Sequence, residues 1–406
     1  MRNAVDLLSR GQRIFVGAAS NEPLSLLQAL QASGVPDDLR FIQFPLGAMN
    51  STDFTAFADT TSVETFFMTP TLAKAEDTSR VFFKPMQMRW VYDYLMQDVD
   101  VALLQVARDQ HGVLRLGPNT DFIGAVLGSA KTVLAELNTS LVAPAGAPQI
   151  AESKIDYLFE SDRQIPEVPT PKIDEAAATI GGLVADLIND GDCIQTGIGA
   201  IPAAILSRLD RKNDLGLHGG LIDDGGMQLI KAGNVTGLRK PIDTGLHVTG
   251  IGLGTKALTS RLSETPDVVF RSANHTHEAS AIARLPNFVS VNSAVEIDLF
   301  GQINAEVAGG RQISGTGGSV DFMRAAKHSK GGKSIVALNA TARGGTVSRI
   351  VAKVEMVTAL RTDVDIVVTE YGVAELKHGS NQERADALIN IAAPEFREEL
   401  RASLLP

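Results

Sequence analysis

One stretch of this chain occurs twice, and the repetition limits the folds that the chain can adopt. Residues 4–17 (AVDLLSRGQRIFVG) resemble residues 184–197 (VADLINDGDCIQTG), with an aspartate, a leucine and two glycines in register. Each copy predicts a helix that ends at a glycine, a short strand, a glycine turn, and a proline that opens the next helix, Pro23 or Pro202. Two related α/β halves explain this pattern, and the competing explanation is chance similarity between two strand–turn–helix units.

Two more pairs of segments repeat in the same order along the chain. Residues 109–113 parallel residues 299–303, and residues 131–135 parallel residues 333–337. The expected strands, such as 101–104, are continuous apolar runs without polar alternation, which is typical of parallel strands covered on both faces. The predicted fold class is therefore α/β, with two related open-sheet domains and right-handed crossovers.

A change in composition marks the expected boundary between the halves. Residues 160–171 (ESDRQIPEVPTP) contain three prolines and four charged residues, a composition that disfavours both helix and sheet. With 406 residues, the chain is long enough for two domains. We expect an N-terminal α/β domain at 1–165 and a C-terminal α/β domain at 172–406.

Composition also excludes several classes of protein. Apolar residues make up 44% of the chain and charged residues 21%, so a packed core is expected rather than disorder. Aspartate and glutamate (47) outnumber lysine and arginine (37), and no basic block occurs, so nucleic acid is not an expected partner. No apolar run is long enough to span a bilayer, and the single cysteine, Cys193, suits a reducing compartment. We expect a cytoplasmic protein without a membrane segment.

Two glycine-rich loops are candidates for ligand binding, because open α/β sheets bind ligands at the carboxyl ends of their strands. Residues 197–202 (GIGAIP) join a strand to a helix, where backbone N–H groups can hold a phosphate, a thioester carbonyl or an oxyanion. Pro202 stands where a dinucleotide-binding loop has its third glycine, which weakens the interpretation as a nucleotide-dependent oxidoreductase. The alternative for this loop is a tight turn that needs glycine for its backbone alone. Residues 315–318 (GTGG) form the second loop.

Two charged residues follow predicted strands. Arg343 could meet a phosphate through its guanidinium group, or it is a solvated surface arginine. Glu370 is either an active-site group or an acceptor that fixes a loop. His275 and His277 lie two residues apart without a cluster of cysteines or carboxylates, so no metal site is expected.

Several segments together resemble the acetyl-CoA hydrolase and CoA-transferase family, which includes 4-hydroxybutyrate and acetate CoA-transferases. The most specific matches lie in the C-terminal half, at residues 292–306, 312–322, 329–335, 369–374 and 394–400. The N-terminal half matches more loosely, at residues 98–117 and 135–138. The resemblance implies two related α/β domains, CoA thioesters as substrates and no permanently bound cofactor.

The resemblance also implies roles for single residues. The residues that would line the thioester and contact its oxyanion are Gly197, Ile198, Gly199, Ala200 and Ile201. Those that would contact CoA are Ala294, Ser314, Gly318 and Arg343. Arg343 stands where relatives usually carry lysine, and Glu370 would be a companion group in the active site.

The nucleophile of the family is a glutamate in a His-Thr-Glu-Met segment. It attacks the acyl-CoA to form an acyl-glutamyl anhydride and then a glutamyl-CoA thioester. The corresponding segment here reads His218-Gly219-Gly220-Leu221, so the matching position is Gly220. Glycine offers no oxygen nucleophile, so the ordinary route cannot run from this position. Two consecutive glycines also allow a backbone path with positive φ.

Two aspartates follow this segment. The family already has an aspartate at the position of Asp224, so Asp223 is the freer candidate. Its side chain is shorter than glutamate and displaced by three residues, so its use as a nucleophile requires a rearranged loop. The predicted catalytic residues are Asp223 and Glu370, either of which could activate water.

Two functions remain open at this point. One is an enzyme that acts on the CoA thioester of a small carboxylic acid by an altered mechanism, either hydrolysis or transfer. The other is a catalytically inactive subunit that binds CoA thioesters or regulates a partner. By family analogy, the expected partners are acyl-CoA, a small carboxylic acid and further copies of the chain in a homo-oligomer, with a dimer as the expectation.

Overall fold

The computed structural model describes residues 3–47, 49–75 and 79–404, which form two compact units. Unit 1 comprises Met1–Pro169, Val248–Thr276 and Ile313–Gly317. Unit 2 comprises Thr170–His247, His277–Gln312 and Gly318–Pro406. The chain thus returns twice to unit 1 after unit 2 has begun.

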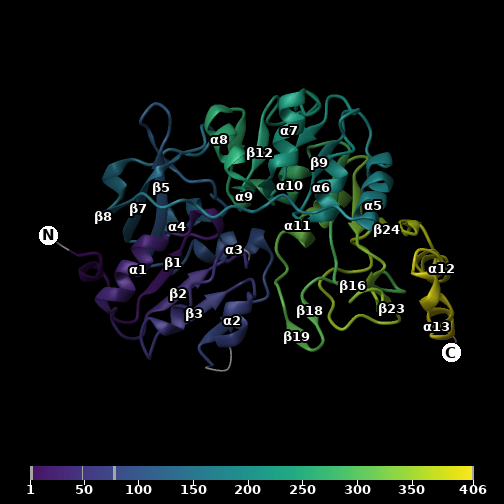
Figure 1. The fold of residues 1–406 in the computed structure, drawn as a ribbon, viewed down its shortest axis with the longest axis horizontal. Helices are drawn as coiled ribbons and strands as arrows, with labels where there is room; N and C mark the ends of the chain where they lie inside the picture. Colours follow the sequence, from purple (N-terminus) through teal and green to yellow (C-terminus); the bar gives the residue numbers. More distant parts are fainter. Residues whose placement is uncertain (1–2, 48, 76–78, 405–406) are drawn as a thin grey trace. The chain divides into compact units, whose positions relative to one another are not determined.

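Unit 1 is built on an eight-stranded sheet within the described residues (Figure 1). The strand order is β4-β3-β2-β1-β5-β7-β8, all parallel, with β6 antiparallel to β5. The strands are β1 (Arg13–Val16), β2 (Arg40–Gln43), β3 (Ser62–Thr65), β4 (Val81–Phe83), β5 (Val101–Arg108), β6 (Leu114–Leu116), β7 (Thr132–Val142) and β8 (Tyr157–Ser161). The helices are α1 (Leu24–Ser33), α2 (Pro70–Ala75), α3 (Met88–Leu95), α4 (Ile123–Ser129), α8 (Lys256–Glu264) and α9 (Ala273–Thr276).

Unit 2 is built on a six-stranded sheet within the described residues, in the order β10-β9-β15-β20-β24-β25. Its strands are parallel except for β25, which pairs antiparallel with β24. The strands are β9 (Cys193–Gln195), β10 (Gly216–Leu217), β15 (Phe288–Asn292), β20 (Lys333–Ala337), β24 (Ile366–Thr369) and β25 (Gly372–Glu375). The helices are α5 (Glu175–Asp186), α6 (Ala200–Leu206), α7 (Asp224–Ala232), α10 (Ala279–Ile282), α11 (Ser319–His328), α12 (Asn381–Asn390) and α13 (Arg397–Ala402).

The two sheets share the arrangement that the repeat predicts. Strands β1, β5 and β7 are neighbours in unit 1, and β9, β15 and β20 are neighbours in the same order in unit 2. The first repeated segment leads into β1 and its copy into β9, and the last pair of repeated segments leads into β7 and forms β20. The prediction of an α/β fold with two related open sheets is confirmed.

The same type of turn occurs in both units. It shows that the predicted alignment of residues 109–113 with residues 299–303 is wrong by one residue. Asp109 and Asp298 each accept hydrogen bonds at Oδ1 from the backbone N–H groups two and four residues ahead. The third residue after each aspartate is a glycine in the left-handed region, Gly112 with φ +79° and Gly301 with φ +87°. Asp109 therefore corresponds to Asp298, because both turns need an acceptor at the first position and a glycine at the fourth.

The segment expected to be an irregular linker starts later than predicted. Strand β8 continues through Glu160 and Ser161 by pairing with β7. Residues 162–174 then contain no helix or strand. Arg163 within this stretch forms an ion pair with the buried Glu136 of β7, with 2.8 Å between Nε and Oε1.

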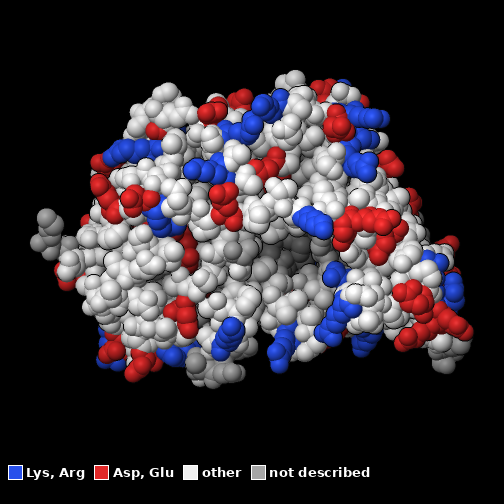
Figure 2. Space-filling view, in the orientation of Figure 1, with Lys and Arg blue, Asp and Glu red and all other residues white. Residues whose placement is uncertain are grey.

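Figure 2 shows basic and acidic side chains interspersed on the face that it presents. None of the helices within 3–47, 49–75 and 79–404 is both long and apolar enough to cross a membrane.

We predict that Asp109→Ala lowers the free energy of unfolding by about 1–3 kcal/mol, because two backbone N–H groups of the turn and Arg115 lose their acceptor. Burial opposes ionisation of Asp109, but hydrogen bonds from Arg115 and the two N–H groups outweigh it and lower its pKa. The stabilisation is therefore present above the ordinary aspartate pKa of about 3.9 and is lost as the pH falls through the lowered value. Urea unfolding at several pH values measures this difference, with the exposed Asp59→Ala as control. Equal losses of unfolding free energy in Asp109→Ala and Asp59→Ala would contradict a stabilising role of the hydrogen bonds to Asp109.

Candidate functional site

The glycine loop of unit 2 follows β9 and leads into α6. Gly199 is the N-cap residue of α6 and has φ +114°, so a backbone reason for glycine exists at this position. A Cβ atom at Gly197 or Gly199 would meet no atom within 4 Å, so the loop borders open space. Ile198 between them is 42% exposed. The loop thus combines accessible backbone with the first turn of a helix, where N–H groups lack intrahelical partners.

The segment with the two consecutive glycines follows β10. Neither Gly219 nor Gly220 has φ in the left-handed region, so the expectation of a positive-φ path is wrong. A Cβ atom at Gly219 would lie 3.3 Å from Cγ of Gln195. A Cβ atom at Gly220 would lie 3.0 Å from both Cε1 and Nε2 of His277. The absence of side chains here reflects close neighbours rather than backbone strain.

The imidazole of His277 occupies the volume next to Gly220. This residue is 2% exposed, and its ring packs against Phe322 with 4.5 Å between ring centroids. A Cβ atom at Gly318 would lie only 2.3 Å from Nε2, so Gly318 also leaves room for the ring. Burial lowers the pKa of His277 to about 3, so the imidazole is uncharged at neutral pH. The sequence interpretation considered His277 only as a metal ligand and missed this packing.

Asp223 caps α7. Its Oδ1 accepts a hydrogen bond of 2.8 Å from the backbone N–H of Gly226. Burial raises its pKa most strongly and the neighbouring Asp224 raises it further, while the bond from Gly226 opposes the shift. The residue also lines a cavity of about 10 Å³, which is about the size that one water molecule needs. Thr196, which directly precedes the glycine loop, and Gly219 line the same cavity.

Glu370 follows β24 and holds the neighbouring strand end in place. Its Oε2 accepts a hydrogen bond of 2.8 Å from the backbone N–H of Ala340, which follows β20. This contact shows that Glu370 fixes a loop, one of the two roles considered from the sequence. The loop continues into a hairpin of β21 (Thr341–Ala342) and β22 (Val347–Ser348), and Arg343 lies exposed at its turn with φ +49°.

Most of the predicted site residues lie in unit 2 at one edge of its sheet. The glycine loop follows β9, Ala294 follows β15, Arg343 follows β20 and Glu370 follows β24. Because these four strands are parallel, their carboxyl ends share an edge. Gly318, the N-cap residue of α11, also belongs to unit 2. Ser314 is the exception, because it belongs to unit 1.

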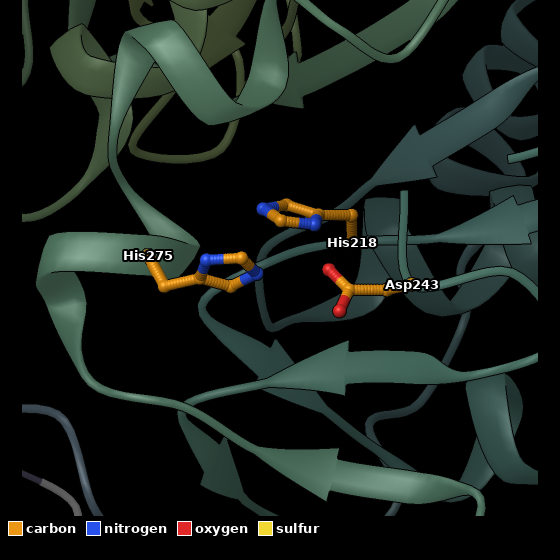
Figure 3. Close-up of side chains that lie close together, drawn as sticks. All are labelled: His218, Asp243 and His275. Atoms are coloured by element: carbon orange, nitrogen blue, oxygen red, sulfur yellow. The ribbon is translucent and has the colours of Figure 1, made fainter. Parts of the chain in front are cut away.

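A second histidine of unit 2, His218, lies near an acidic residue (Figure 3). One imidazole nitrogen of His218 and one carboxylate oxygen of Asp243 lie within 4.8 Å of each other. His218 directly follows β10 and is fully buried. His275, the third side chain drawn there, belongs to α9 of unit 1. The sequence interpretation did not single out Asp243.

Sequence models of two protein domains match the chain. The acetyl-CoA hydrolase/transferase N-terminal domain matches residues 1–169, and the corresponding C-terminal domain matches residues 254–404. This chain belongs to the acetyl-CoA hydrolase/transferase family. The resemblance inferred from the sequence is confirmed, and the family acts on CoA thioesters.

Two curated relatives of the family illustrate the degree of similarity. The chain is 44% identical to 4-hydroxybutyrate coenzyme A transferase of Clostridium kluyveri over 306 residues, 74% of this chain and 71% of the relative. It is 37% identical to butyryl-CoA:acetate CoA-transferase of Anaerostipes caccae over 325 residues, 76% of this chain and 72% of the relative.

Two solved structures are similar over nearly the whole chain. RipA from Yersinia pestis has a TM-score of 0.90 at 32% identity, covering 98% of this chain and 95% of that one. A 4-hydroxybutyrate CoA-transferase from Porphyromonas gingivalis has a TM-score of 0.80 at 31% identity, with the same coverage.

The two domain matches do not include residues 170–253. This stretch contains the glycine loop after β9, the segment with Gly220, and Asp223. The correspondence between Gly220 and the glutamate of the family therefore stays a prediction.

We predict that Gly220→Glu destabilises unit 2 by about 1–3 kcal/mol, because the new side chain starts 3.0 Å from the His277 ring with Phe322 nearby. Adding His277→Ala removes the obstacle, so the double variant is more stable than the sum of the two single changes predicts. Urea unfolding of all four proteins gives the coupling free energy. Strictly additive effects would show that His277 does not restrict position 220.

Proposed function

We propose that this protein binds the CoA thioester of a small carboxylic acid at the carboxyl edge of the sheet in unit 2, and hydrolyses it without a glutamyl intermediate. The observation that supports this most directly is the water-sized cavity lined by Asp223, Thr196 and Gly219. It combines a carboxylate, room for one water molecule and the loop that follows β9. These are the groups that thioester hydrolysis requires.

The proposed reaction assigns one task to each group. Water in the cavity attacks the thioester carbon while Asp223 accepts one of its protons. Backbone N–H groups at the start of α6, from Ala200 and Ile201, stabilise the oxyanion that forms. The C–S bond then breaks, the proton passes to the departing thiolate, and a carboxylic acid and CoA are released.

Packing around Gly220 argues against the glutamyl route. Glycine supplies no nucleophile, and the imidazole of His277 fills the neighbouring volume. Asp223 is held as a helix cap, so its carboxylate is fixed beside the cavity rather than free to form a covalent intermediate. The raised pKa of Asp223 makes it a stronger base than an ordinary aspartate.

One observation favours the alternative of a binding or regulatory subunit without turnover. Both predicted catalytic carboxylates form contacts that stabilise the local structure, Asp223 with Gly226 and Glu370 with Ala340. Release of free CoA from acetyl-CoA, propionyl-CoA and butyryl-CoA, with ¹⁸O from water traced into the acid, distinguishes the two functions. Transfer to an added carboxylate would place no ¹⁸O in the acid and would contradict hydrolysis.

We predict that Asp223→Asn lowers the hydrolysis rate constant by about 100-fold or more, because an amide cannot accept the proton. Stability should change little, because asparagine caps helices as well as aspartate does. The wild-type rate should rise with pH and level off above the ordinary aspartate range, because the pKa of Asp223 is raised.

Asp224→Asn provides the matched control next to it and should retain the wild-type rate on the high-pH plateau, because the proton acceptor is kept and only its pKa is lowered. If Asp223→Asn were as active as wild type, Asp223 would be a structural cap only.

We predict that Arg343→Ala weakens CoA binding about two- to fivefold, because an exposed guanidinium gains roughly 0.5–1 kcal/mol from a phosphate. The difference should shrink as salt is raised. Calorimetric titration with CoA at two ionic strengths measures it, with the exposed Arg401→Ala as control. Equal affinities of both variants for CoA would show that Arg343 is a solvated surface residue that does not contact the phosphate.

A further inference from the structure

A second arginine of unit 2, Arg349, lies at the base of the hairpin of β21 and β22, whose turn carries Arg343. The backbone N–H of Arg349 donates to the carbonyl of Ala340 at 2.8 Å. Ala340 follows β20, and its own N–H donates to Oε2 of Glu370, which follows β24. The backbone of Arg349 is therefore bound to the carboxyl edge of the sheet in unit 2, where parallel sheets bind ligands.

The backbone of Arg349 is held on both sides by bonds that do not involve its side chain. Its carbonyl accepts a hydrogen bond of 2.8 Å from the N–H of Ile297 in β16 (Glu296–Asp298). Strand β23 (Ile350–Val351) follows directly and pairs parallel with β16. The hydroxyl of Ser348, on the other side, donates to the carbonyl of Ile350 at 2.6 Å. The guanidinium group is therefore not needed to fix this loop.

The side chain of Arg349 lacks an acceptor. The residue is half-buried, and its Nε is buried without a hydrogen-bond partner among the described residues. The Nε of Arg384 is in the same position, but Nη1 and Nη2 of Arg384 donate to the carbonyls of Leu376 and Arg361. Within 3–47, 49–75 and 79–404, the guanidinium group of Arg349 forms neither a hydrogen bond nor an ion pair. Because a buried charged donor without an acceptor costs free energy, an anionic group from outside the chain would stabilise it.

Acidic residues on the elements bound to Arg349 serve other donors. On β16, Oε1 of Glu296 accepts from a side-chain amide at 2.9 Å and from the N–H of Glu355 at 2.7 Å. Asp298 on the same strand accepts the backbone N–H groups of its own turn. Glu370 accepts from the backbone that follows β20. Arg349 is thus available to an anionic ligand.

We propose that Arg349 binds a phosphate group of CoA and is the main anchor for the phosphates in unit 2. A guanidinium group can bind phosphate through two parallel N–H···O hydrogen bonds, and a half-buried one is screened less by salt than an exposed one. The exposed Arg343 at the turn of the same hairpin then adds a weaker contact. This inference rests on the proposed function for its ligand, but not on hydrolysis, since CoA can bind without turnover.

The test compares ligands that lack one or all of the phosphate groups. CoA, dephospho-CoA and pantetheine are titrated calorimetrically into the full chain and into Arg349→Gln. The variant should bind CoA about ten- to hundredfold more weakly than wild type, because hydrogen bonds to a charged group are lost. Pantetheine carries no phosphate, so both proteins should bind it equally. Equal affinities for dephospho-CoA would assign the contact to the 3′-phosphate, and a retained difference would assign it to the diphosphate.

Arg401→Gln, an exposed change in the same unit, is the matched control and should bind all three ligands as wild type does. Arg349→Lys keeps the charge without the planar fork, so its affinity for CoA should lie between those of wild type and Arg349→Gln. It also decides the test if Arg349→Gln does not fold.

An unchanged affinity of Arg349→Gln for CoA, or equal losses for CoA and pantetheine, would overturn the proposal. Binding of CoA that depends on Arg349, without release of CoA from acyl-CoA, would contradict only the hydrolysis proposed for unit 2. Failure of wild type to bind CoA would overturn both.

Discussion

The packing of His277 determines what the site in unit 2 can contain. Its ring lies against two residues that have no side chain, Gly220 and Gly318, and against Phe322. Each glycine is needed because the ring is there, since a Cβ at either position would lie 3.0 Å or less from Nε2. A side chain at position 220 therefore requires the imidazole of His277 to shift by a few tenths of an ångström.

Much of the fold could be predicted from the sequence, because the repeat is local. A helix, a glycine, an apolar strand and a second glycine lie within fourteen residues, and their order sets the β1 and β9 units. The predicted alignment of the two turns is wrong by one residue, because it matches segments by overall similarity. What the turn requires is a side-chain acceptor followed three residues later by a glycine in the left-handed region, as at Asp109 and Gly112. The start of the linker was placed too early, because the pairing of β8 with β7 outweighs an unfavourable composition.

The candidate site was predictable only in part, for a related reason. The residues at strand ends were found, because a parallel sheet brings the carboxyl ends of its strands to one edge. The contact of His277 with Gly220 was not found, because it joins residues 57 positions apart through a ring that no motif identifies. The two consecutive glycines, Gly219 and Gly220, were the available signal. From the sequence, these glycines are expected to allow a backbone with positive φ. In the structure they instead leave room for neighbouring side chains, Gln195 and His277.

Three aspartates show how the same side chain acquires different chemistry in this fold. Asp109 is buried yet stays ionised, because Arg115 and two N–H groups hold its charge. Asp223 also interacts with backbone N–H groups, among them that of Gly226, but its pKa is raised because burial outweighs them. Asp121 has burial alone, and its pKa reaches about 7. The donors around Asp109 lower its pKa, whereas burial raises the pKa of Asp223 and of Asp121. The two aspartates with raised pKa values both line cavities beside the strands that the repeat made equivalent, β1 and β9. Each unit thus places a carboxyl group beside a cavity, but on a different loop, since Asp121 precedes α4 and Asp223 caps α7.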